Sequence, residues 1–152
     1  MQKVHVLGLD ALASRGSWER PGRSHELSVF VPYTTSDLTR AALSAVVAFT
    51  RNLGAHVSLL AVQVVPFPLP LDRPAISMSF FEQELDAVAR SIEVPVDAHV
   101  IIARDRELAL DRGIAPGSLV VLATRKRWWP TAQTKLARLL ARTGHSVALL
   151  EI

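Results

Sequence analysis

A basic loop without glycine is the stretch of this chain best suited to bind an anion. It follows a predicted apolar strand at 119–123 and reads Arg125, Lys126, Arg127, Trp128, Trp129, Pro130. In nucleotide-binding α/β domains, glycines in a loop at this place let backbone N–H groups close on phosphate. This chain has no glycine between Gly117 and Gly144. We therefore expect any anion to be bound by Arg and Lys side chains rather than by a backbone cradle.

Trp128 and Trp129 beside these cations form a second pattern with a chemical meaning. Indoles next to Arg and Lys stack on nucleic-acid bases or lie at membrane surfaces. More often, an indole in such a loop closes over the core or forms a contact between subunits. We therefore expect neither nucleic acid nor a membrane among the partners.

The residue types that catalyse reactions form no recognisable set in this sequence. There is no cysteine, which excludes thiolate nucleophiles, disulfides and Cys-ligated zinc. No serine lies in G-x-S-x-G, and the five histidines lack the H-E-x-x-H spacing. Asp105, Glu107 and Asp111 lie in a short charged segment, where exposed ion pairing is their expected role. We predict neither an enzyme nor a metal site.

Length and composition indicate one folded domain in the cytoplasm. The chain has 152 residues, of which 49% are hydrophobic, and a net charge of +3. This is enough to bury a core. No apolar run approaches the roughly 20 residues that span a bilayer, and the first residues lack the apolar core of a signal peptide. The lack of cysteine fits a reducing compartment.

Apolar strands alternate with amphipathic helices from Leu27 to the last residue. Residues 1–25 combine one short apolar piece with Gly, Pro and Arg, which predicts an N-terminal arm or linker, and 26–152 are predicted to form a single α/β domain. The strands are predicted at 27–31, 57–65, 94–103, 119–123 and 147–152. Strands separated by helices need right-handed crossovers, so we expect a doubly wound, five-stranded, mostly parallel Rossmann-like sheet.

Two local patterns place side chains within these elements. Thr35, Ser36 and Asp37 supply N-cap chemistry for a helix. Its buried stripe is predicted from helical spacing as Leu38, Ala42, Ala45, Phe49 and Leu53. Pro95 lies near the start of 94–103 and cannot donate a ladder hydrogen bond, so this strand is predicted at a sheet edge.

Three runs of residues share a family pattern. Residues 31–36 read V-P-Y-T-T-S, 53–62 read L-G-A-H-V-S-L-L-A-V, and 117–125 read G-S-L-V-V-L-A-T-R. They resemble the universal stress protein domain, which reads V-P-V-D-G-S, G-A-x-L-x-L-L-x-V and V-x-G-T at the corresponding places. The resemblance covers roughly 27–152. It implies the fold shared with adenine nucleotide alpha hydrolases, the strand order 3-2-1-4-5 and a regulatory role in the stress response.

The signature positions of the ATP-binding members are changed in this chain. Those members carry G-x2-G-x9-G-[ST] after the fourth strand. Here Ala123 and Lys126 stand in place of the first two glycines, Gln133 and Thr134 in place of the final Gly-Ser, and Thr34 aligns with the aspartate that helps hold adenosine. Cβ atoms would obstruct the close backbone approach that phosphate needs. The resemblance thus implies the class without tight ATP binding, and we expect no cofactor, with ATP and AMP disfavoured.

The family strand order implies a crevice beyond the carboxyl ends of the first and fourth of these strands. Its candidate ligand-binding residues are Tyr33, Thr34, Thr35, Ala123, Thr124, Arg125, Lys126, Arg127, Gln133 and Thr134. The crevice is either a degenerate anion or nucleotide site or a vestige with solvated cations. The expected function is a regulatory or interaction domain. One alternative is a nucleotide- or anion-sensing domain whose strongest catalytic activity would be weak nucleotide hydrolysis. The other is a cytosolic regulatory domain of a larger transporter or kinase.

The last strand, 147–152, is predicted at a sheet edge and needs a cover. It is apolar, lacks proline and carries one charge, so its unpaired N–H and C=O groups could pair with another chain. Antiparallel pairing of two copies gives a twofold interface, which the resemblance also implies. We therefore predict a homodimer through Val147, Leu149 and Ile152. The alternative cover is residues 3–7 of the arm, and a protein partner or a covalently attached domain is a further possibility.

Overall fold

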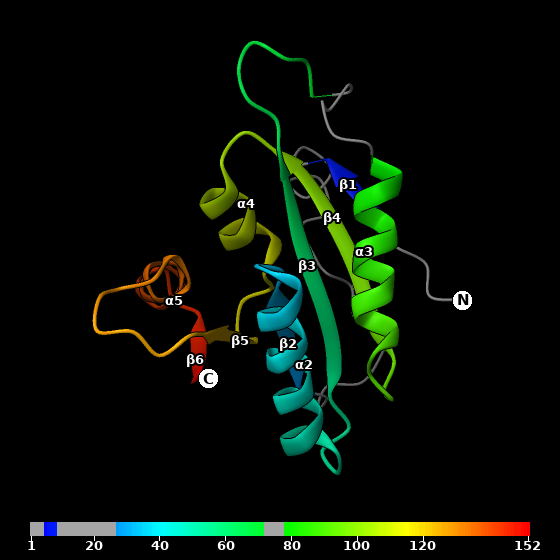
Figure 1. Ribbon diagram of the computed structural model, residues 1–152, viewed down its shortest axis with the longest axis vertical. Coiled ribbons are helices and arrows are strands. Elements are labelled where there is room, and N and C mark those ends of the chain that lie inside the picture. The colour runs from blue at the N-terminus through cyan, green and yellow to red at the C-terminus, as the bar shows by residue number, and fades with distance from the viewer. Residues whose placement is uncertain (1–4, 9–26, 72–77) are drawn as a thin grey trace.

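The computed structural model describes residues 5–8, 27–71 and 78–152. The strands are β1 (His5–Gly8), β2 (Ser28–Pro32), β3 (His56–Val64), β4 (Val96–Ala103), β5 (Leu119–Thr124) and β6 (Ser146–Glu151). The helices are α2 (Ser36–Thr50), α3 (Met78–Arg90), α4 (Arg106–Gly113) and α5 (Ala132–Arg142). The sheet has the order β1-β4-β3-β2-β5-β6, with α2 and α3 on one face and α4 and α5 on the other (Figure 1).

The predicted doubly wound fold is confirmed. Each neighbouring pair of strands is parallel. From β2 onwards the five strands have the order 3-2-1-4-5. The order reverses between β2 and β5, so the carboxyl ends of these two strands flank the point where open α/β sheets bind ligands.

β1 is a sixth strand, in a segment that the sequence predicted as part of an arm. His5–Gly8 pairs with His99–Ile102 of β4, so the prediction that 94–103 is an edge strand is wrong. Pro95 is compatible with this arrangement, because pairing with β1 starts four residues after it. The alternative that residues 3–7 of the arm cover β6 is wrong for the described residues 5–7, since these pair with β4 at the opposite side of the sheet. Residues 1–4 and 9–25 of the predicted arm lie outside the described residues.

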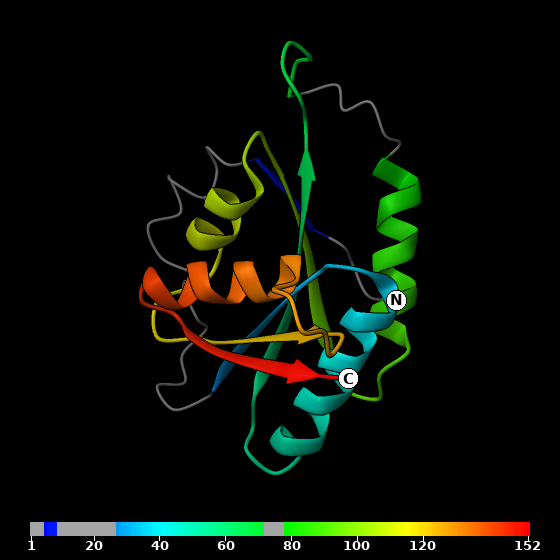
Figure 2. The same cartoon turned by 60° about the vertical axis from the view of Figure 1, so that its left-hand side comes forward.

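Two apolar layers hold the sheet between the helices, because successive strand residues face opposite sides. Val31 and Leu59 face α2 and α3, whereas their chain neighbours Phe30 and Leu60 face α4 and α5. The first layer is completed from the helices by Leu38, Leu43, Val46, Leu85 and Val88, and the second by Leu110, Leu136 and Leu140. Figure 2 shows α5 lying across its face of the sheet beside β6. Both layers extend to the switch point and fix the ends of β2 and β5.

The buried face of α2 differs from the predicted stripe. Its buried residues are Leu38, Thr39, Ala42, Leu43, Val46 and Thr50, whereas Phe49 is 45% and Leu53 60% exposed. The inward positions follow a spacing of four from Leu38, and Phe49 lies about 100° around the helix from Thr50. Leu53 lies beyond the end of the helix.

Among the helices that the structure describes, none combines the length and the apolar character that a membrane span requires.

Candidate functional site

The structure brings the two halves of the predicted crevice together. β2 and β5 are neighbours, with Val29 opposite Leu119 and Phe30 opposite Val120. The segment 33–35 follows β2 and leads into α2, and the basic loop follows β5 and leads into α5. Both segments therefore lie at the switch point of the sheet.

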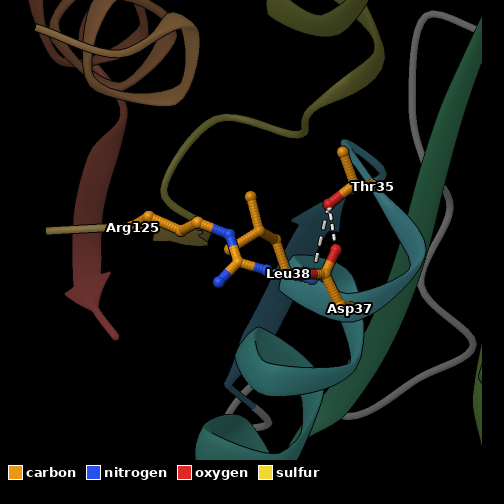
Figure 3. Close-up of polar contacts among 4 residues, drawn as sticks. All are labelled: Thr35, Asp37, Leu38 and Arg125. Carbon is orange, nitrogen blue, oxygen red and sulfur yellow. Dashed lines mark hydrogen bonds and ion pairs between the residues drawn. The ribbon is translucent and has the colours of Figure 1, made fainter. Parts of the chain in front are cut away.

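An ion pair joins these two segments. Arg125 contacts the Asp37 carboxylate, and both side chains are about half exposed. The Thr35 hydroxyl donates to Asp37 Oδ1 at 2.6 Å and accepts from the Leu38 N–H at 3.4 Å (Figure 3). Thr35 is thus the N-cap of α2, and Asp37 places a negative charge in the first turn of that helix.

The surroundings of Asp37 keep it ionised. Its pKa is lowered chiefly by the hydrogen bond from Thr35, with smaller effects from the Leu38 N–H and the Arg125 charge. A helix N-terminus is where a protein commonly binds phosphate. At the N-terminus of α2, the Asp37 carboxylate provides the negative charge that a bound phosphate would otherwise provide. The N-cap pattern identified Asp37 only as a helix start, so the sequence did not predict it as a site residue.

Tyr33, one of the predicted crevice residues, contacts α3. Its hydroxyl donates to Glu84 Oε1 at 2.6 Å, and its ring packs edge-on against Phe81 with centroids 5.8 Å apart. Burial is the main cause that raises its pKa, followed by the hydrogen bond to Glu84 and the negative charge of that carboxylate. Arg106 of α4 donates to the Tyr33 carbonyl at 2.9 Å. Glu84 and Arg106 had no motif that would have revealed these roles.

The backbone N–H groups at three of the predicted site residues already have acceptors within the protein. The Thr34 N–H donates to Thr39 Oγ1 at 3.1 Å, and the Lys126 N–H donates to the Ile152 carbonyl at 3.1 Å. The Thr134 N–H donates to Thr131 Oγ1 at 3.1 Å. These donors therefore do not form a free cradle for phosphate.

Threonine hydroxyls occupy the connection where the family pattern has glycines. Ala123 and Thr124 end β5 and are buried. Thr124 Oγ1 lies 2.6 Å from Thr131 Oγ1, which lies 2.9 Å from Thr134 Oγ1. Thr131 is the N-cap of α5, and Gln133 follows in the first turn as a half-buried residue. The hydroxyl contacts fasten the start of α5 to the end of β5.

No protein-family model matches this sequence, and no curated protein matches it. The universal stress protein resemblance therefore stays a prediction from the three sequence runs. Among the residues that the structure describes, no group of three or more His, Cys, Asp or Glu side chains is placed to hold a metal ion. The function of the crevice has to be inferred from its own contacts.

The tip of the basic loop is exposed. Trp128 is 94% exposed and Trp129 51%, so Trp128 does not close over the core, which was one of the two roles expected for these indoles. The two rings lie 5.7 Å apart and are tilted by 56°. The Arg127 guanidinium lies 5.4 Å from the centre of the Trp129 ring. Lys126 and Arg127 are exposed as well, and neither has the carboxylate partner that Arg125 has in the described structure.

A serine, a histidine and an aspartate meet at the opposite end of the sheet, where β3 and β4 begin. His56 Nε2 lies 2.7 Å from Asp97 Oδ2, and Ser58 Oγ lies 3.5 Å from His56 Nδ1. Such a set can activate a serine nucleophile. Here Ser58 is only 3% exposed, so a substrate cannot reach its hydroxyl. No sequence pattern indicated this group, because only the strand register places Ser58 opposite Asp97.

Proposed function

We propose that this chain is a regulatory or interaction domain of the universal stress protein type that acts in the cytoplasm without binding ATP tightly. The observation that supports this most strongly is the contact between Arg125 and Asp37. Asp37 already places a negative charge in the first turn of α2, and Arg125 of the basic loop neutralises that charge.

A phosphate group would meet three obstacles in this crevice. The Asp37 carboxylate would repel it, because like charges in close contact are unfavourable. Arg125 would have to leave its carboxylate partner before it could bind the ligand. The Lys126 and Thr134 N–H groups would have to give up their present acceptors. The alternative function, an anion-sensing crevice, therefore requires these contacts to open first.

The interaction role is supported by the exposed edge of the sheet. β6 is the last strand and pairs with β5 along one side, and no described segment pairs with its other side. Val147 and Leu149 pack toward the core layer of α4 and α5. A homodimer would therefore form through the backbone groups of β6, with Ile152, which is 50% exposed, at the margin. A protein partner or an attached domain could use the same edge.

Titration calorimetry with MgATP and with AMP tests the proposal. We expect both dissociation constants to be weaker than about 1 mM, because the obstacles above act on the phosphate groups that the two ligands share. The Asp37→Asn variant, which keeps the side-chain shape and removes the charge, is the matched comparison and should bind more tightly than the parent. Micromolar affinity of the parent for ATP would contradict the proposal.

A further inference from the structure

Residues 112–150 have a strong excess of positive charge. No Asp or Glu occurs from Arg112 to Leu150. The same stretch contains seven cations, which are Arg112, Arg125, Lys126, Arg127, Lys135, Arg138 and Arg142. The whole chain has a net charge of only +3. The positive charge is therefore concentrated around β5, α5 and the loop between them.

The cations of α5 lie on its exposed side. Lys135, Arg138 and Arg142 follow helical spacing and are exposed, while Leu136 and Leu140 are buried against the sheet. The basic loop leads directly into this helix (Figure 2). We call the exposed set formed by the loop and the helix the Trp–Arg surface; it consists of Lys126, Arg127, Trp128, Trp129, Lys135, Arg138 and Arg142.

The tip of the Trp–Arg surface is apolar as well as basic. Trp128 is 94% exposed, although an indole offers a large apolar area for burial. Ile152 is half exposed and adjoins the loop, because its carbonyl accepts from the Lys126 N–H. Exposed apolar side chains with cations around them mark a surface that another structure covers.

We propose that the Trp–Arg surface docks on an anionic lipid bilayer, a partner that the sequence pattern alone disfavoured. Trp128 and Trp129 would lie at the level of the headgroups, where amphipathic rings are most favourable, and the Arg and Lys side chains would contact lipid phosphates. Clusters of four to eight cations are typical of surfaces that bind anionic lipids. The Trp–Arg surface contains five, without counting Arg125, whose charge is neutralised by Asp37.

The ring geometry favours a bilayer over a single-stranded nucleic acid. Bases bound by such proteins stack on the faces of successive aromatic rings along a basic groove. Here the two rings are tilted by 56°, and Arg127 lies over one face of Trp129. Insertion into a headgroup layer needs only a protruding apolar tip among cations. A second copy of this chain is disfavoured on this surface, because two cationic surfaces repel each other.

Vesicle flotation tests the proposal with the full chain. We expect binding to phosphatidylcholine vesicles that contain phosphatidylserine, and little binding to phosphatidylcholine alone. Binding should weaken in 1 M salt, where the screening length falls to about 3 Å. In a Trp18→Phe background, which leaves only the two loop indoles, tryptophan emission should shift to shorter wavelength with the anionic vesicles. Equal binding to both vesicle types, or no binding at low salt, would overturn the proposal.

Two variants and two matched controls locate the contact. Arg138→Glu with Arg142→Glu should weaken the partition coefficient by about 25-fold or more, since each cation near an anionic surface contributes about fivefold. Trp128→Ser should also weaken it, and its exposure means that the fold is kept. The charge control is Arg51→Glu with Arg90→Glu, two exposed cations at the C-terminal ends of α2 and α3. The aromatic control is Phe80→Ser, at a residue of α3 that is 66% exposed. Both controls should leave binding unchanged.

Three results would contradict the assignment. The first is an equal loss of binding in Trp128→Ser and Phe80→Ser. The second is tight binding of a single-stranded oligonucleotide by a chain that does not bind anionic vesicles. The third is self-association of the parent that Trp128→Ser abolishes, which would identify the surface as a contact between copies.

Discussion

Asp37 and Tyr33 follow the same strand, yet their surroundings favour opposite protonation states. The Asp37 carboxylate accepts a hydrogen bond from Thr35 and contacts Arg125, and both interactions stabilise its charged form. The Tyr33 hydroxyl is partly buried and donates to a carboxylate, which stabilises its neutral form. At neutral pH Asp37 is therefore ionised and Tyr33 is neutral.

Tyr33 is the only tyrosine of the chain, so tyrosinate absorbance reports on this residue alone. We expect its midpoint in the folded protein to lie above the ordinary pKa of 10.0, because burial and Glu84 raise it. The unfolded chain in denaturant should titrate near the ordinary value. Glu84→Gln, which keeps a hydrogen-bond acceptor and removes the charge, should titrate at a lower pH than the parent. A folded midpoint at the ordinary value would show that Tyr33 is neither buried nor in contact with Glu84.

The raised pKa of Tyr33 also predicts how the stability of the fold changes with pH in alkaline solution. Because the folded pKa is raised, the contribution of Tyr33 is complete below pH 10 and is lost as the pH rises toward the folded pKa. Over that range, the free energy of unfolding of the parent should fall more steeply with pH than that of Tyr33→Phe. The difference in slope corresponds to the release of up to one additional proton when the parent unfolds. Urea unfolding at several pH values measures this difference.

The connection between β5 and α5 differs most from the family pattern. Without glycine, it is fastened by side chains: Thr124, Thr131 and Thr134 form a line of hydroxyl contacts. The sequence predicted the loss of the backbone cradle from the missing glycines, but the replacing contacts depend on rotamers and could not be predicted. Nor could the partner of Arg125, since Asp37 is 88 residues away along the chain.

Gly113 controls how closely α4 approaches the sheet. A Cβ at this position would lie 2.6 Å from Ile101 Cδ1 and 3.1 Å from Leu60 Cδ2, and both of these side chains are fully buried. Overpacking of this kind typically costs about 1–3 kcal/mol, and the helix preference of alanine returns at most about 1 kcal/mol. Gly113→Ala should therefore lower the free energy of unfolding by about 1–2 kcal/mol in a denaturant titration.

Ile101→Val provides the control for this prediction, because it removes the Cδ1 atom that the new methyl group would meet. Alone it should cost about 0.5–1.5 kcal/mol. In its background, Gly113→Ala should cost less than in the parent. An equal cost in both backgrounds would mean that α4 does not contact Ile101 in this way.

The doubly wound sheet could be predicted from the alternation of apolar strands and amphipathic helices. Right-handed crossovers leave only a few topologies for such an alternation. The sequence indicated that residues 3–7 could add to the sheet as a strand, but beside β6; the place of β1 on β4 could not be predicted, because β-propensity does not select an edge. With β1 added, β4 is an interior strand, and β1 and β6 are the two edge strands of the described sheet. The edge of β6 is left without a pairing partner among the described residues.

We predict that two copies pair through β6. Sedimentation of the parent should show a dimer at micromolar concentration. Ala148→Lys, at an exposed position near the middle of β6, should give a folded monomer because two lysines would meet close to the twofold axis. Leu149→Pro should also prevent pairing, and circular dichroism must show that it folds. A parent that is monomeric at high micromolar concentration would rule out this interface.

We infer that Asp37 takes the place of a bound anion at α2 and keeps Arg125 from binding one. Thermal unfolding in sulfate, compared with chloride at matched ionic strength, measures whether an anion binds here. We predict that sulfate does not raise the unfolding temperature of the parent but clearly raises that of Asp37→Asn. Adding Arg125→Ala to Asp37→Asn should remove this increase. Sulfate at ten times its dissociation constant would stabilise the folded protein by about 1.4 kcal/mol. A sulfate shift in the parent as large as that of Asp37→Asn, abolished by Arg125→Ala, would contradict the claim.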